Sequence, residues 1–260
     1  MAEGTGDGGV GLGVLVAYLD ELLEAQKGAD FGPNGLQVEG RPTVRKLVTA
    51  VSAGVELFAR ARMAGADAVL VHHGLFWDRQ PSVLTGFRYR RVAELIHSGM
   101  SLIAYHLPLD RNPELGNNAL AAKAFGLTEI EPFGEHDGLP VGCKGRLPEP
   151  LPAAELVDLC RRVFGQEPLA FLGGPERVST VGLISGGGQG EIYQAIAEEL
   201  DAYVTGEASE WVMNVAHDAG IHYLAAGHYA TERLGVRALG EHVARRFGIE
   251  VEFVDLPNPV

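Results

Sequence analysis

The sequence predicts an α/β protein with mostly parallel strands. From residue 47 onward, short apolar runs alternate with stretches of helical spacing, and strands that alternate with helices pair in parallel through crossovers. The chain has 260 residues, 46% of them hydrophobic and 21% charged, which is enough to bury a sizeable core. The polar residues with the richest chemistry directly follow apolar runs, as in α/β proteins whose sites lie at the carboxyl ends of strands.

The first half of the chain carries the clearest alternation. Leucines at three- and four-residue spacing predict a helix over residues 10–26, and the Gly and Pro residues that follow predict a loop and a short strand over 31–40. The remaining predicted elements are strands at 47–53, 67–73 and 102–105, and helices at 55–64, 89–97 and 117–125.

The second half repeats the alternation. Apolar runs lie near residues 141, 169, 181, 202, 221 and 251, and helical stretches lie at 152–164, 189–200, 207–219 and 229–247. A polar stretch at 131–137 reads as a connector. We therefore expect a flexible tail at 1–9, a first α/β lobe at 10–130 and a second at 131–260.

The composition of the chain limits which partners and which cellular compartment are compatible with the protein. A net charge of -13 repels nucleic acid and anionic membranes, so an anionic substrate needs a local basic or metallic site. Cys143 and Cys160 are not in a Cys-x-x-Cys spacing, which argues against a disulfide framework and is compatible with a cytoplasmic location. Without a signal-like start or a long apolar run, we expect no membrane association.

Three histidines and an aspartate follow two neighbouring strands. His72 and His73 end one predicted strand, and Pro108 stops the next, which leaves His106 and Asp110 in a loop at the same edge of a parallel sheet. A hydrogen-bonded pair of loop histidines is the plainer alternative for His72 and His73. The shared edge favours metal ligation.

A second donor pair lies near the C-terminus. His228 and Glu232 open the helix at 229–247, and their i, i+4 spacing projects both side chains from one helix face. Helical spacing of this kind offers two ligands to one metal, while a surface His and Glu is the alternative.

The complete donor set exceeds what one ion needs. It contains three imidazoles and two carboxylates: His72, His73, Asp110, His228 and Glu232. Because a carboxylate can bridge two ions, the set favours a two-metal centre that activates water and polarises the bond under attack. Mixed nitrogen and oxygen ligands suit zinc, iron or manganese and do not choose among them.

Other motifs leave more than one reading. The Gly-rich segment at 184–190 lacks the ending of a nucleotide P-loop and is better explained as a tight turn. The run Arg88-Tyr89-Arg90-Arg91 could contact a phosphate, although such a run is more often a solvated face. Glu207, Glu210 and Trp211, near the start of another predicted helix, could line a pocket.

Taken together, six ordered motifs resemble the Nif-three-like dinuclear metal proteins, whose members are commonly described as homologues of GTP cyclohydrolase type two. The motifs are Asn-Gly-Leu-Gln-Val at 34–38, His-His-Gly-Leu-Phe-Trp at 72–77, Tyr-His-Leu-Pro-Leu-Asp at 105–110, Gly-Asn-Asn at 116–118, Thr-Gly-Glu at 205–207 and Gly-His-x-x-Thr-Glu at 227–232. The resemblance spans about residues 10–256.

The resemblance implies a specific ligand arrangement. His72 and Asp110 would hold one ion, His73 and His228 the other, and Glu232 would bridge them. It also implies two interlocked α/β lobes, with the second lobe returning the His228 helix to the metal site, and a ring-shaped homohexamer.

For function, we expect a metal-dependent hydrolase. His106 is the first candidate for proton transfer and Glu207 the second, and the resemblance points to a small-molecule substrate such as the purine nucleotide GTP. The alternative is a metal-binding scaffold or regulatory partner without catalysis. The two differ at the metal site, because an enzyme keeps water at its ions whereas protein ligands close a structural site. A nucleic-acid-binding ring is disfavoured by the acidic balance.

Overall fold

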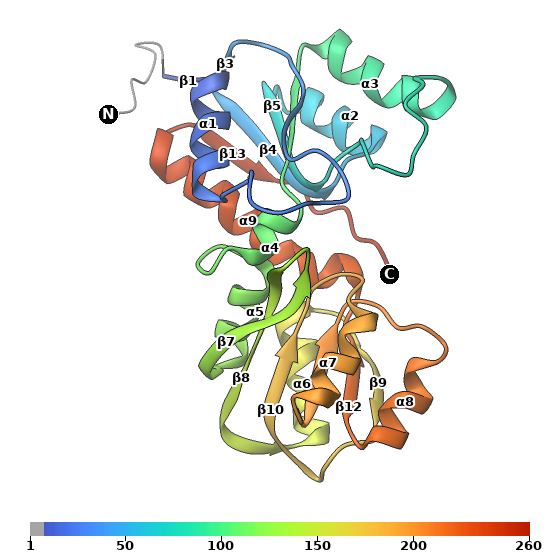
Figure 1. Cartoon of the computed structure of the whole chain (residues 1–260). Helices are drawn as coiled ribbons and strands as arrows, with labels where there is room; N and C mark the ends of the chain where they lie inside the picture. The colour runs from blue at the N-terminus through green and yellow to red at the C-terminus, as the bar shows by residue number, and fades with distance from the viewer. Residues whose placement is uncertain (1–7) are drawn as a thin grey trace. The chain divides into compact units, whose positions relative to one another are not determined.

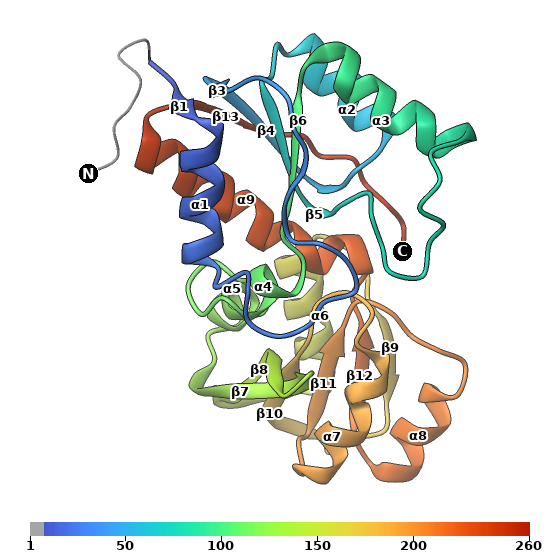
Figure 2. The same ribbon diagram turned by 45° about the horizontal axis from the view of Figure 1, so that its top comes forward.

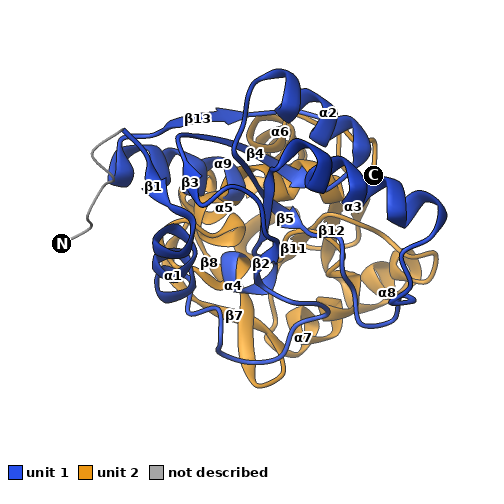
Figure 3. Cartoon of the chain, turned by 90° about the horizontal axis from the view of Figure 1, so that it is seen from above, with its two compact units in different colours: residues 1–109, 236–256 blue, residues 110–235, 257–260 orange. Residues whose placement is uncertain are grey.

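The computed structural model of the chain describes residues 8–260 and divides into two compact units. Unit 1 comprises the described part of Met1–Leu109 together with Val236–Leu256, and unit 2 comprises Asp110–Gly235 with Pro257–Val260 (Figure 3). The chain passes between the units three times: inside the helix α4 (Leu107–Arg111), inside the helix α9 (His228–Phe247), and between Leu256 and Pro257. Most of the expected tail, residues 1–7, lies outside the described residues, while Gly9 is already buried.

Unit 1 is built on a five-stranded sheet whose order is β13-β4-β5-β6-β2. The strands are β2 (Gly35–Val38), β4 (Lys46–Ser52), β5 (Ala68–His73), β6 (Ser101–Ala104) and β13 (Glu250–Phe253). β13, β4, β5 and β6 run parallel, and only β2 is antiparallel to its neighbour. A small antiparallel pair joins β1 (Val10–Gly11) to β3 (Thr43–Val44).

Helices cover both faces of this sheet (Figure 2). On one face, Val48, Val69 and Leu102 pack against Phe58 of α2 (Val55–Met63) and Leu95 of α3 (Gly86–Ser98). On the other face lie α1 (Leu12–Leu22) and the unit 1 part of α9, joined by a 2.6 Å hydrogen bond between a tyrosine of α1 and His242 of α9. The strands read as continuous apolar runs because both faces are buried.

Unit 2 is built on a six-stranded mixed sheet whose order is β7-β8-β10-β11-β12-β9. The strands are β7 (Thr128–His136), β8 (Leu139–Pro152), β9 (Leu169–Leu172), β10 (Arg177–Leu183), β11 (Ala202–Thr205) and β12 (His222–Ala225). The central strands β10, β11 and β12 are parallel, and the outer strands are antiparallel to their neighbours.

Unit 2 is also covered on both faces (Figure 1). Helices α5 (Asn117–Phe125) and α6 (Ala153–Phe164) pack on one face through Phe125, Cys160 and Phe164. The helices α7 (Ile192–Ala197) and α8 (Val212–Ala219) lie on the opposite face. A 3-10 turn, η1 (Gln189–Glu191), directly precedes α7. Both cysteines are buried and free, as expected for small core residues.

The predicted α/β class is confirmed, with local differences. Residues 131–137, expected as a connector, lie in β7 and the turn after it, and the expected lobe boundary at 130/131 falls inside this strand. β7 is an edge strand with mostly exposed side chains, so its sequence is polar and resembles a loop. Asp110 lies in the short helix α4, not in a loop, because Pro108 is tolerated in the first turn of a helix.

In the part of the chain that the structure describes, no helix combines the length and the apolar character needed to cross a membrane.

Candidate metal centre

Three histidines converge in unit 1. His72 and His73 end β5, and His106 lies between β6 and α4. Since β5 and β6 are adjacent and parallel, their carboxyl ends meet at the same edge of the sheet. One ring nitrogen from each histidine lies within 4.8 Å of the others, a spacing that could accommodate a metal ion.

Each of these imidazoles is held through its Nδ1 atom. The Nδ1 of His72 lies 2.9 Å from the backbone oxygen of Tyr105. A carbonyl oxygen can only accept, so Nδ1 carries the proton and the lone pair of the ring is on Nε2. The Nδ1 of His73 lies 3.0 Å from Oγ of Ser52. Such hydrogen bonds fix the ring and tautomer of metal-binding histidines.

His106 is paired with a buried carboxylate. Its Nδ1 lies 2.7 Å from Oδ1 of Asp30, whose side chain is 5% exposed. Burial raises the pKa of Asp30, but the hydrogen bond and charge of His106, with further hydrogen bonds from Asn34 and Phe31, outweigh it and leave the pKa below its ordinary value. Asp30 is therefore an anion that orients His106.

Unit 2 presents a second group of donors at the carboxyl ends of its parallel strands. Ser185 follows β10, Glu207 follows β11 and His228 follows β12. Glu232 lies one turn further along α9 and is 3% exposed, and Asp110 of α4 is 7% exposed. A buried carboxylate is costly unless it is hydrogen-bonded or binds a cation.

Asp110 is anchored within unit 2. Its Oδ1 accepts hydrogen bonds from Nδ2 of Asn117 at 2.8 Å and from Oγ of Ser185 at 3.0 Å. The Oδ1 of Asn117 in turn accepts from the backbone N–H of Gly235 in α9 at 2.7 Å. Asn117 thus ties the carboxylate to the helix that carries His228.

His228 lies between two glutamates. Its Nδ1 is 2.6 Å from Oε1 of Glu207 and its Nε2 is 3.2 Å from Oε2 of Glu232. Burial lowers the pKa of His228, but Glu232 and then Glu207 outweigh it and raise the pKa to about 9. The pair of carboxylates therefore favours a positive charge at this point, which a metal cation supplies as well as a proton.

The Gly-rich segment is a tight turn, and it also makes room for Glu232. Gly186 has a φ of +67°, and a Cβ atom at this position would lie 2.2 Å from Oε1 of Glu232. The Gly186 N–H donates to Oγ1 of Thr231 at 3.0 Å, and Oγ1 of Thr205 donates to its carbonyl at 3.1 Å. Both the positive φ and the lack of space for a Cβ atom require a glycine at position 186.

The expected site residues therefore form local groups. Unit 1 brings together His72, His73 and His106, and unit 2 brings together Glu207, His228 and Glu232, with Asp110 held by its own partners. Of the two other residues near Glu207, Glu210 is exposed and Trp211 stacks on Tyr193 with ring centroids 5.5 Å apart.

Sequence reasoning missed the residues that hold these groups. They are Asp30, Ser52, Asn117, Ser185 and Thr231. Asn117 belongs to the Gly-Asn-Asn motif and Thr231 to the Gly-His-x-x-Thr-Glu motif, so a signal existed for both. Asp30 and Ser52 carry no local signal, because their partners are distant in sequence.

The donor chemistry fits divalent metal ions. Imidazole nitrogens and carboxylate oxygens are gathered without a thiolate, a set that suits zinc, iron or manganese. His and Glu residues of this arrangement, some of them buried, could hold a metal ion.

Comparison with known proteins gives the family. The model of the family Duf34/NIF3 (NGG1p interacting factor 3) matches residues 11–259. The chain belongs to the Duf34/NIF3 family. The match covers nearly the whole chain, and the resemblance inferred from the six motifs is confirmed.

Relatives in this family are similar in sequence over almost their full length. A Pseudomonas aeruginosa protein named "GTP cyclohydrolase 1 type 2 homolog" is 44% identical over 250 residues, which cover 96% of this chain and 99% of that protein. An Escherichia coli K12 protein of the same name is 43% identical over 250 residues, covering 94% and 98%.

Solved structures confirm the fold. The structure described as "protein ybgI, unknown function" matches with a TM-score of 0.92 at 41% identity, covering 96% of this chain and 100% of that one. The protein TTHA1606 from Thermus thermophilus matches with a TM-score of 0.87 at 38% identity, with the same coverage.

Proposed function

We propose that this protein is a dinuclear divalent-metal protein that acts as a hydrolase on a purine nucleotide. In the proposed centre, His72 and Asp110 would hold one ion, His73 and His228 would hold the other, and Glu232 would be shared by both. The ions would be zinc, iron or manganese. We further propose that it works as a homohexamer, as its family resemblance implies, and in the cytoplasm, with which its two unpaired cysteines are compatible.

The observation that carries the metal proposal is the way the histidines are held. In His72, Nδ1 faces the backbone oxygen of Tyr105, so Nδ1 carries the proton and Nε2 can ligate. In His228, Glu207 holds Nδ1, and Nε2 faces Glu232, the other proposed ligand on α9. Metal-binding histidines are oriented in this way, whereas surface histidines have no need of such partners. Buried Glu232 and Asp110 add the negative charge that two cations require.

The residues of the chain have distinct roles in the proposed reaction. Two divalent ions at this centre would supply activated water and polarise the bond under attack. His106, with Nδ1 hydrogen-bonded to Asp30, accepts a proton at Nε2, and the buried carboxylate stabilises the imidazolium that results. Glu207 holds His228 through a 2.6 Å hydrogen bond, so we assign it a positioning role in place of the second proton-transfer role expected from sequence.

The relatives' names support the substrate class. Several curated relatives at about 40% identity are named as GTP cyclohydrolase homologues, and hydrolytic opening of a purine ring adds water at a carbon atom of the base. GTP is therefore the first substrate to test. The net charge of -13 repels a nucleoside triphosphate at long range, so a positive local site is required to bind it.

The test combines metal content with turnover. Protein purified without chelator is analysed for metal, then incubated with GTP, ATP and guanosine, and products are separated by chromatography with mass detection. We expect a product of GTP that is heavier by one water, no product in His228→Ala, and a rate that recovers when metal is restored to chelated wild type.

Two outcomes would contradict the proposal. The metal centre would be contradicted if folded wild-type protein held no stoichiometric metal even after incubation with zinc, iron or manganese salts. If the protein held its full metal content but turned over no nucleotide, the hydrolase activity would be contradicted. The metal-binding scaffold would then be the remaining proposal.

A further inference from the structure

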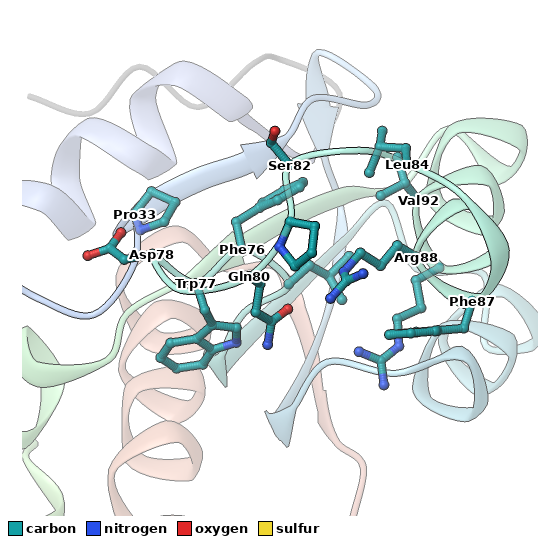
Figure 4. Close-up of a pocket in the computed structure, with 13 residues that line it drawn as sticks. Pro33, Phe76, Trp77, Asp78, Gln80, Ser82, Leu84, Phe87, Arg88 and Val92 are labelled. Carbon is teal, nitrogen blue, oxygen red and sulfur yellow. The ribbon is translucent and has the colours of Figure 1, made fainter.

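Unit 1 contains a pocket of about 260 Å³ beside the histidine cluster. It is lined largely by aromatic and apolar side chains together with two arginines, Arg88 and Arg91. Figure 4 labels Arg88 among the lining residues. Ligand pockets commonly start at roughly 300 Å³, so this one has the size of a subsite that holds part of a larger ligand.

The pocket joins the histidine cluster through Trp77. The Trp77 ring contacts His106 edge-on, with centroids 5.2 Å apart, and lies 5.9 Å from the ring of His73. Trp77 also lines the pocket. A ligand that lies against this ring is therefore next to the proposed proton-transfer residue.

The other end of the pocket is positively charged. Arg88 and Arg91 are three residues apart on α3 and so lie on the same side of the helix. The guanidinium carbons of both lie over the ring of Phe87, at 5.0 and 5.4 Å from its centroid. Cation–π contact thus places both guanidinium groups against one ring and neutralises neither.

The acidic residues of the chain do not neutralise these arginines. Among residues 8–260, neither Arg88 nor Arg91 takes part in an ion pair, although the protein has 34 acidic residues. The Nε atom of Arg88 is shielded from solvent and has no hydrogen-bond partner. Asp78, the one carboxylate in the lining, lies near Pro33 at the opposite end from Arg88 (Figure 4). Two uncompensated guanidinium groups beside a cavity suit an anion with several oxygens, such as a phosphate chain.

We propose that this pocket is the nucleotide-recognition subsite of the protein. Arg88 and Arg91 bind the phosphate oxygens, and Trp77 contacts the base next to the histidine cluster. Aromatic contact with a base and arginine contact with phosphate are the two interactions that nucleotides offer together. The substrate class rests on the proposed function, but binding at the pocket can be measured separately.

The experiment measures nucleotide binding by tryptophan fluorescence. The chain has two tryptophans, so in a Trp211→Phe background Trp77 is the only one that reports. The full-length protein is titrated with GTP, guanosine and inorganic triphosphate. The variants are Arg88→Ala and Arg91→Ala, with Arg88→Lys to retain the charge. Arg90→Ala is the matched control because Arg90 is exposed on the same helix and does not line the pocket.

We expect GTP to quench Trp77. Each of Arg88→Ala and Arg91→Ala should raise the Kd for GTP about tenfold or more, as expected when one charge-assisted contact is lost, while Arg90→Ala stays near wild type. The Kd of Arg88→Lys for GTP should lie between that of Arg88→Ala and that of wild type. Guanosine should bind weakly and equally to all variants, because it lacks the phosphates that the arginines contact.

The outcomes separate this inference from the proposed function. If GTP is turned over, the two alanine variants should raise KM and leave kcat nearly unchanged, since these arginines lie away from the reacting atoms. If GTP binds with this arginine dependence but is never turned over, the subsite is supported and the hydrolase proposal fails. Absence of quenching by GTP, or an equal Kd in Arg88→Ala, Arg91→Ala and Arg90→Ala, would overturn the inference even with turnover intact.

Discussion

The Nδ1 atom of His106 lies 2.7 Å from Oδ1 of Asp30, a carboxylate that is 76 residues away in sequence. Asp30 also accepts hydrogen bonds from Nδ2 of Asn34 at 2.8 Å and from the backbone N–H groups of Phe31 and Leu107 at 2.7 and 3.0 Å. One buried anion thus joins the loop after α1 to the start of α4. Its removal has consequences for both stability and proton transfer.

Asp30→Asn should destabilise the protein in a pH-dependent way. The folded-state pKa of Asp30 is below its ordinary value, so its contribution to stability is complete above the unfolded pKa of about 3.9 and is lost as the pH falls through the folded pKa. We expect a loss of about 1–3 kcal/mol in unfolding free energy near neutrality, shrinking toward acid pH. Urea denaturation at a series of pH values measures both the loss of unfolding free energy near neutrality and its decrease toward acid pH.

Asp218→Asn is the matched control, because Asp218 is exposed. It should leave the unfolding free energy within about 0.5 kcal/mol of wild type. If Asp30→Asn lost the same stability at every pH, the anion would not be the cause.

His106→Ala should separate proton transfer from metal ligation. Because we assign His106 to proton transfer, its removal should leave about two metals per chain and abolish most turnover, whereas His73→Ala should leave about one metal. Elemental analysis of folded protein gives the metal content. A His106→Ala protein that lost one metal would instead place His106 among the ligands, which its position near His72 and His73 permits.

Glu232→Ala should cost more metal than any single histidine change. Its carboxylate is proposed to bridge both ions, so the two cations would each lose a bond and the charge that offsets their repulsion. We expect close to no metal in Glu232→Ala, and no rise in Tm when metal is added, in contrast to wild type.

Glu210→Ala removes an exposed carboxylate in the same unit and should behave as wild type in both measurements. A folded Glu232→Ala protein with about two metals per chain would refute the bridging role.

Two adjacent glycines should respond differently to alanine. In Gly186→Ala the new Cβ would lie 2.2 Å from Oε1 of Glu232 and the residue would have to keep a φ of +67°, so we expect a loss of about 1–3 kcal/mol in stability and weaker metal binding. In Gly187→Ala the nearest atom would be 3.7 Å away, so metal content and Tm should stay near wild type. Equal effects would mean that the turn supplies only backbone geometry.

Both cysteines should be unreactive in the folded protein. Burial raises the pKa of Cys143 to about 12 and also raises that of Cys160, so neither forms an appreciable thiolate at neutral pH. A thiol reagent such as Ellman's reagent should modify neither residue in native protein and both after unfolding in guanidinium. Rapid labelling of the native protein would show that these thiols reach solvent.

The sequence alone was sufficient for the elements whose pattern is local. The pattern over residues 117–125 predicts a helix, which is α5, and the apolar run before His73 predicts a strand, which is β5. The resemblance carried by the six short motifs is confirmed by the family match over residues 11–259. His72 and His106 could be expected at one sheet edge because both lie at the carboxyl ends of predicted parallel strands.

What could not be predicted depends on long-range contacts. The sequence gives no reason to connect Asp30 with His106 or Ser52 with His73, because nothing in either local pattern refers to the other. The polar sequence of 131–137 predicts a connector where the structure has most of β7, because an exposed edge strand has the composition of a loop. The spacing of apolar residues predicts the long helix α9, but periodicity within one helix cannot show that the helix continues from one unit into the other.

The discontinuity of unit 1 has a consequence for synthesis on the ribosome. Unit 1 needs Val236–Leu256, which supplies the last part of α9 and the strand β13 that pairs with β4. When residues 46–104 emerge, β4 has no partner on that side and a face of the new sheet is uncovered. Almost all of unit 2 is translated before those final residues appear, so it can fold first. During this period the edge of β4 in the nascent N-terminal half remains unpaired. We therefore expect chaperone binding or aggregation to begin at this stage of synthesis.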